Sequence, residues 1–144
     1  MSSNKNIYEV FDDFKNAKTK EERLTILRKN ESWALKNVLM GAFNPLIKFT
    51  IKEIPKFKKE PVPPGFGYNH MTDALGKVYL FTEGHPNVSP NLTDKRKEEL
   101  LIQILESLEG KEADVYAAML KKDLKIPHLT PKLVGEAFPG LLPE

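Results

Sequence analysis

The chain has 144 residues, a net charge of +2 and no cysteine, which excludes disulfide bonds and cysteine-ligated zinc sites. Hydrophobic residues make up 40% and charged residues 29%, the balance of a folded globular protein rather than a disordered one. The sequence has no signal peptide and no apolar run near the roughly 18 residues that span a bilayer, so we expect a cytoplasmic protein without membrane contact.

Apolar residues recur at helical spacing through the first third of the chain. We expect a first helix over about residues 5–17, and Thr19 with Glu22 forms a capping box that would begin a second helix. A third helix should follow Asn30, whose side chain can cap it, and stop near residues 41–45. The expected inward positions of these helices are Ile7, Val10, Phe11, Phe14, Leu24, Ile26, Leu27, Trp33, Leu35, Val38 and Leu39.

The middle of the chain is less regular. The apolar pattern of residues 46–54 fits a strand by partial alternation and also fits one face of a helix. Residues 55–70 are rich in proline and glycine, which predicts a loop. Thr72 is then expected to cap a helix that runs to about Leu80, and a second proline-containing loop should cover residues 83–91.

The last third of the sequence predicts further helices. Thr93 should cap the longest one, over about residues 94–109, with Gly110 as its C-terminal stop. Another helix is expected over residues 111–124, with Val115, Tyr116, Met119 and Leu120 facing inward.

A final helix should begin at Thr130-Pro131, because a capping threonine followed by proline is a strong start signal. It should end at Phe138-Pro139-Gly140. With about six to eight helices, no repeat and no second core, we expect an all-α fold: a single compact domain over residues 1–144.

Catalytic motifs are absent from the sequence. His70, His85 and His128 are far apart and form no metal-binding spacing. Gly65 and Gly67 lack the third glycine and the preceding strand of a dinucleotide site, and no P-loop sequence occurs. We therefore expect a protein that works by binding, without enzyme activity, cofactor or metal.

Lysines cluster at two places in the sequence. The first cluster is Lys48, Lys52, Lys56, Lys58 and Lys59. The second is Lys121, Lys122 and Lys125, beside Thr130-Pro131-Lys132. Free backbone N–H groups at a helix start can hold a phosphate, to which nearby lysines add positive charge. A solvated surface is the alternative explanation of both clusters, and a net charge of +2 is low for a nucleic-acid binder.

Several stretches resemble the N-terminal DNA-binding domain of ATP-dependent DNA ligases, in the short form found in T-even phages. Residues 34–56, from A-L-K-N-V to F-T-I-K-E-I-P-K, are similar to that domain's helix, turn and I-K-K-W-P-K segment. Residues 119–144, with M-L-K-K-D-L and F-P-G-L-L-P-E, are similar to its M-x-R-D-L run and W-P-G-L-I-P ending. Residues 71–75, M-T-D-A-L, look like its T-D-x-L helix start. The resemblance covers about residues 20–144 in the same order.

The resemblance implies an all-helical domain that grips the minor groove of duplex DNA. The K-x-D-G motif of the ligase catalytic domain is absent, so it implies a non-catalytic, sequence-independent binder of double-stranded or nicked DNA. Such a protein would be an accessory of phage DNA replication, repair or recombination in the bacterial host. The ligase family has a glycine after D-L where this chain has Lys125. Together with the lysine clusters, the resemblance points to phosphate contacts at Lys48, Lys52, Lys56, Lys121, Lys122, Lys125, Thr130 and Lys132.

A rival hypothesis is a protein-interaction module that kept the ligase-like fold but no longer binds DNA. The low net charge and the lysine in place of glycine favour it. Phe66 and Tyr68, in the loop over residues 61–68, would form the contact surface. The partner would be a polymerase, a sliding clamp, another phage replication protein or a host protein.

Overall fold

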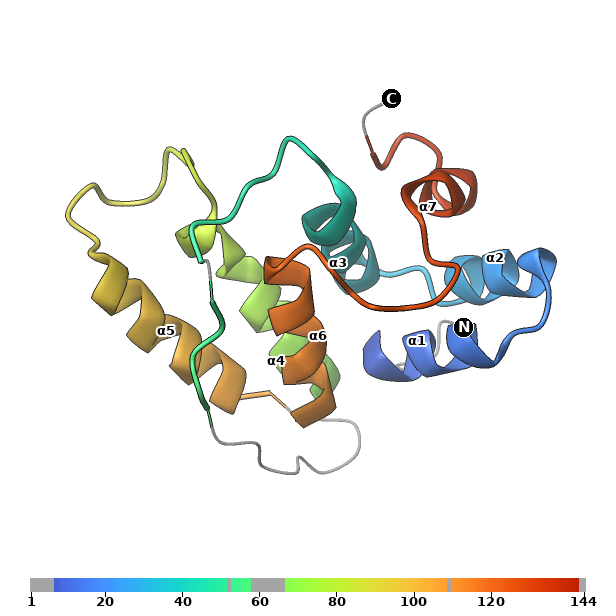
Figure 1. Cartoon of the computed structure of the whole chain (residues 1–144), viewed down its shortest axis with the longest axis horizontal. Helices are drawn as coiled ribbons and strands as arrows, with labels where there is room; N and C mark the ends of the chain where they lie inside the picture. The colour runs from blue at the N-terminus through green and yellow to red at the C-terminus, as the bar shows by residue number, and fades with distance from the viewer. Residues whose placement is uncertain (1–6, 52, 58–66, 109, 143–144) are drawn as a thin grey trace.

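The fold is all-helical, as the sequence predicts. The computed structural model describes residues 7–51, 53–57, 67–108 and 110–142 (Figure 1). Over these residues, strand-like pairing is limited to one antiparallel bridge between Phe49 and Thr82. The helices are α1 (Ile7–Asn16), α2 (Lys20–Lys29), α3 (Trp33–Phe43), α4 (Gly67–Gly76), the short 3-10 helix η1 (Val78–Phe81), α5 (Asp94–Glu106), α6 (Gly110–Leu120) and α7 (Pro131–Ala137).

Helix α6 lies at the centre of the arrangement and packs against α1, α3 and α5. Helix α3 also packs against α4, while α1 packs against α2 and α2 against α7. Figure 1 shows α5 at one end of the molecule, α2 and α7 at the other, and α6 between them. Buried side chains from all seven α-helices form one continuous hydrophobic cluster, so the described helices share a single core.

Three predicted N-caps are confirmed. The hydroxyl oxygens of Thr19, Thr93 and Thr130 each accept the backbone N–H three residues on, at 3.1, 3.1 and 3.2 Å. In the capping box, the carboxylate of Glu22 in turn accepts the backbone N–H of Lys18 at 2.9 Å. These bonds satisfy backbone donors that have no partner inside a helix, which explains why α2, α5 and α7 begin where they do.

The cap predicted at Asn30 was wrong. Ser32 caps α3 instead, accepting the backbone N–H of Leu35 at 3.0 Å. The Asn30 side chain closes the preceding helix, because its amide nitrogen donates to the carbonyl of Ile26 at 2.8 Å. Trp33 is then the first residue of α3 and is 53% exposed, not buried as its apolar character suggested.

Further helix boundaries differ from the prediction. Helix α4 begins at Gly67, within the stretch predicted as a loop, so Thr72 lies inside the helix rather than at its start. Helix α5 ends at Glu106, and Gly110 begins α6 instead of stopping α5. Helix α6 ends at Leu120, short of the predicted end at 124. Local sequence signals misplaced these boundaries, since tertiary packing can override local preference.

Hydrogen bonds from buried side chains fix α6 to two of its neighbours. The Tyr116 hydroxyl donates to the backbone carbonyl of Ala74 in α4 at 2.9 Å, and burial raises the pKa of this hydroxyl. Glu112 is fully buried, and its carboxylate accepts the backbone N–H of Tyr8 in α1 at 2.6 Å. The Glu112 carboxylate thereby caps the first turn of α1, where a negative charge is favoured.

Helix α3 packs tightly against Met119 of α6 at Gly41. A Cβ atom at Gly41 would lie 2.7 Å from Sδ and 2.8 Å from Cγ of Met119. Atoms cannot pack that closely, so a side chain at this position would force the buried Met119 side chain to move.

We expect Gly41→Ala to lower the free energy of unfolding by about 1–2 kcal/mol, because overpacking against Met119 outweighs the higher helix propensity of alanine. Urea denaturation followed by circular dichroism measures the change. Gly135→Ala in α7 is the matched control, since a Cβ there meets nothing within 4 Å. The control should gain about 0.5–1 kcal/mol. Equal effects of the two substitutions would contradict the close approach at Gly41.

Candidate nucleic-acid interface

The C-terminal end of α6 carries the second lysine cluster. The backbone N–H of Lys122 donates to the carbonyl of Met119 at 2.9 Å, and that of Asp123 donates to the carbonyl of Ala118 at 3.0 Å. These two bonds form a Schellman motif, in which the residue after the C-cap is usually a glycine. Here that residue is Lys122, with a φ of 58° in the left-handed region. The helix therefore ends on a strained lysine.

The side chain of Lys122 explains why a lysine occupies this position. Its Nζ donates to the carbonyls of Gly41 and Asn44 at 2.9 and 2.8 Å, and it lies 5.4 Å from the ring centroid of Phe49. Carbonyls at the end of α3 have no partner within that helix, and a cation is favoured there. Burial lowers the pKa of Lys122. Its ammonium is thus directed at the protein, not at a phosphate in solvent.

The connection from α6 to α7, residues 121–130, follows a strained path. Lys125 and His128 also have left-handed φ values, 55° and 68°. The Asp123 carboxylate accepts the backbone N–H of Lys125 at 3.1 Å, and Leu129 is buried. A left-handed residue other than glycine costs on the order of 1 kcal/mol, so packing and hydrogen bonds around the connection must hold it in place.

Exposed cations line this connection. Residues 121–132 contain four lysines and one acidic residue, Asp123, which already accepts the backbone N–H described above. Lys122 is committed to the end of α3, while the other three lysines are exposed. Thr130 is exposed as well, and its hydroxyl oxygen caps α7. We refer to Lys121, Lys125, Thr130 and Lys132 as the α6–α7 surface.

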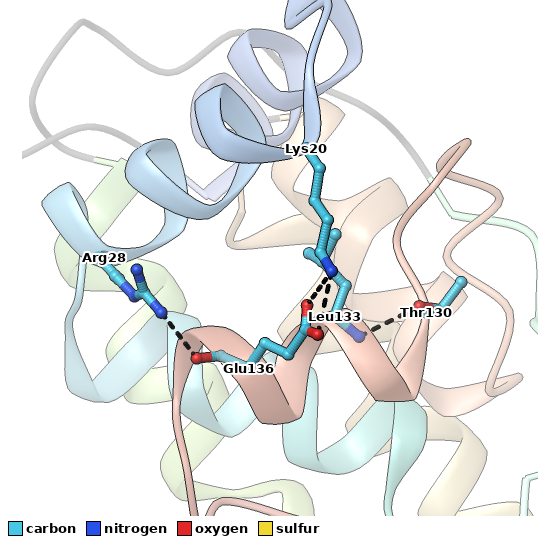
Figure 2. A network of polar contacts seen from close by, with 5 residues as sticks. All are labelled: Lys20, Arg28, Thr130, Leu133 and Glu136. Carbon is cyan, nitrogen blue, oxygen red and sulfur yellow. Dashed lines mark hydrogen bonds and ion pairs between the residues drawn. The ribbon is translucent and has the colours of Figure 1, made fainter.

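Helix α7 is fastened to α2, which sets the direction of the α6–α7 surface. Figure 2 shows Lys20 and Arg28 of α2 reaching Glu136 of α7. The two carboxylate oxygens of Glu136 lie 3.0 and 2.9 Å from Nζ of Lys20, and its backbone carbonyl accepts a hydrogen bond from Arg28 at 2.8 Å. Such partly exposed pairs each contribute under about 1 kcal/mol, but together they fix which face of α7 meets solvent.

The fold separates Lys48 and Lys56, the two described members of the first lysine cluster. Residues 46–51 form neither a helix nor a full strand; the carbonyl of Lys48 accepts the N–H of Glu83 at 2.7 Å next to the Phe49–Thr82 bridge. Because Phe49 lies under the ammonium of Lys122, the neighbouring Lys48, which is exposed, lies close to the end of α6.

Lys56, the other described member of that cluster, is not brought to the same place. Lys56 is exposed, and the adjacent Pro55 lines a hollow with Asp94 and Glu98 of α5. Figure 1 draws residues 53–57 beside α5 and away from α7. Lys52, Lys58 and Lys59 lie outside the described residues. Lys48 is not in a helix, so the prediction that Lys48 and Lys52 share one helix face does not hold at Lys48.

The residues predicted for the rival protein-interaction surface are not tested. Phe66 lies outside the described residues, as does the side chain of Tyr68, whose backbone is part of α4.

No group of three potential metal ligands occurs among the described residues. Helices long and apolar enough to cross a membrane are also absent from the part of the chain that the structure describes.

The role of Lys122 has no local signal in the sequence. Its carbonyl partners, Gly41 and Asn44, precede it by 81 and 78 residues. The sequence predicts a helix that continues to residue 124, so neither the helix end at Leu120 nor the contact of Lys122 with α3 could be read from it.

Comparison with known families gives one match. The model of a family described as "Family of unknown function (DUF6433)" matches residues 10–126, which include the end of α6 and Lys125 but stop before Thr130 and Lys132. None of the curated proteins matches the chain. Because the family description assigns no function, the resemblance to DNA ligase domains stays a prediction.

Replacing Lys122 by methionine tests its role in the fold. We expect Lys122→Met to lower the free energy of unfolding by about 1–3 kcal/mol, since it leaves two carbonyls at the end of α3 without their donor. Lys121→Met, next to it but exposed, is the matched control and should change stability by less than about 0.5 kcal/mol. Urea denaturation of both variants gives the comparison, and similar decreases would contradict the contact between Lys122 and α3.

Proposed function

The chain belongs to the DUF6433 family, and from its own surface we propose that it is a non-catalytic protein that binds duplex DNA without sequence specificity. The observation that carries this proposal is the α6–α7 surface, where three exposed lysines lie on a connection held in a fixed path. Lysine contacts with phosphates supply affinity that does not depend on sequence. On this proposal the protein is an accessory of phage DNA replication, repair or recombination.

The fixed geometry of the surface favours binding over a merely solvated face. Lys121 follows the last turn of α6, Lys125 is held by the turn around Asp123, and Lys132 is in the first turn of α7. Because the backbone is ordered before binding, the protein gives up less conformational freedom when a ligand is bound. Lys48, near the end of α6, would extend the same basic surface.

The turn at Lys125 also supports the resemblance to ligase domains. In that family a glycine follows the D-L pair, and glycine readily adopts left-handed φ values. Lys125 follows Asp123-Leu124 here and has a φ of 55°. The backbone at this position therefore has a conformation that a glycine would adopt without strain, although the side chain differs.

A salt series tests the proposal directly. Replacement of Lys121, Lys125 and Lys132 together by glutamine should flatten the slope of log affinity against log salt, by about 0.9 for each phosphate that is no longer neutralised. Fluorescence anisotropy with intact, nicked and single-stranded DNA measures the slope. The matched control replaces Lys29, Lys77 and Lys95, which are exposed elsewhere, and should retain most of the affinity. Absence of binding to all three DNAs at low salt and micromolar protein would reject the proposal.

Lys125→Gly separates the charge of Lys125 from the backbone turn. We expect the free energy of unfolding to stay the same or rise by up to about 1 kcal/mol, because relief of the left-handed strain offsets the extra freedom of glycine in the unfolded chain. The salt slope should nevertheless flatten by about 0.9. Lys125→Val, with a branched side chain, should be clearly destabilised. If thermal unfolding ranks the glycine variant no higher than the valine variant, strain at Lys125 is not the constraint.

A further inference from the structure

An apolar groove lies between the C-terminal end of α3 and one face of α7. Its floor and walls come from Phe43, Pro45, Pro131, Gly135, Pro139 and Leu142. Its volume of about 600 Å³ falls in the range of pockets that accept a ligand or the side chains of a bound segment. The three prolines restrict the backbone of its walls, so the groove is formed before anything binds.

Gly135 on the floor of this groove is unusual for its position. It lies within α7, where glycine destabilises a helix relative to alanine. A Cβ atom at Gly135 would meet nothing within 4 Å, in contrast to Gly41, where it would clash with Met119. Packing inside the chain therefore does not require this glycine. Bare backbone at Gly135 keeps the groove open, which is what close approach of a ligand requires.

The rim of the groove adds an exposed apolar side chain and a positive charge. Leu46 follows Pro45 in the chain and is 78% exposed, more than any other large apolar side chain among the described residues. Lys132 is the one charged residue among the described residues of the lining. The carboxylate nearest along α7, that of Glu136, is directed to Lys20 of α2 (Figure 2). A complementary ligand is therefore apolar with a negative charge at one end.

We propose that this groove binds a short acidic segment of a partner protein. An apolar side chain of the segment lies over Gly135 and against Leu142, and a carboxylate beside it pairs with Lys132. Apolar walls offer phosphates no hydrogen bonds, so a peptide fits the groove better than a nucleic acid does. The inference does not depend on DNA binding. Because Lys132 borders both surfaces, however, a bound acidic segment would compete with DNA for this lysine.

Peptides selected from a displayed library can test whether the groove binds an acidic segment. A random library of 12-residue peptides is selected on the wild-type protein, with Gly135→Leu as the counter-selection. A Cβ atom at this position meets nothing within 4 Å, so we expect the leucine side chain to occupy the groove and to leave the thermal midpoint unchanged or a few degrees higher. Enriched peptides should combine acidic residues with a large apolar one. Their Kd should rise about tenfold or more in Gly135→Leu, rise severalfold in Lys132→Gln and stay constant in Lys95→Gln.

Each other outcome overturns the inference. Peptides that bind Gly135→Leu as well as the wild type would lie elsewhere on the surface, and enriched sequences without acidic residues would exclude pairing with Lys132. Failure to enrich any peptide over the counter-selection would show that the groove is not a peptide site. If Gly135→Leu weakens binding of duplex DNA instead of peptides, the groove belongs to the DNA surface. Since the selection contains no DNA, its failure is independent of the proposed function.

Discussion

The ammonium of Lys122 joins two helix ends, and the arrangement around it depends on that contact. The carbonyls at the end of α3 need a donor, and the end of α6 needs a residue in the left-handed conformation. Lys122 supplies both the donor to α3 and the left-handed residue that ends α6, although a glycine would be less strained in the left-handed conformation. The contact is possible because Gly41 lets α3 and α6 approach closely. The backbone cost at Lys122 is therefore offset by a contact between elements far apart in the sequence.

The basic surface follows from this junction. Once the end of α6 is fixed, the connection to α7 leaves it in one direction, with Lys121 and Lys125 outside and Leu129 buried. Contacts from Lys20 and Arg28 to Glu136 then hold α7, so that Lys132 and Gly135 meet solvent away from the contacts with α2. The positive charge of Lys132 and the apolar groove at Gly135 thus lie side by side, because both residues belong to the short helix α7.

Local signals predicted the helices well and their ends less well. Thr19, Thr93 and Thr130 cap helices as expected, because a cap is a contact between residues three apart. Ser32 took the place of Asn30, since either side chain could have capped α3 and packing selected the start. For the candidate site, the sequence identified the lysines but not their separate roles. Lys122 and Lys121 are neighbours, and only a contact across about 80 residues distinguishes them.

The helices at the two ends of the chain are held by each other. Glu112 caps α1 through Tyr8, 104 residues away, and Glu136 joins α2 through Lys20, 116 residues away. Closing loops of this length is entropically unfavourable until the intervening chain is in place. Helices α1 and α2 are synthesised before α6 and α7, yet their side chains and backbone contact residues of these later helices. Stable packing of α1 and α2 should therefore follow the synthesis of α6 and α7, and folding should be slower than in a bundle built from neighbouring hairpins.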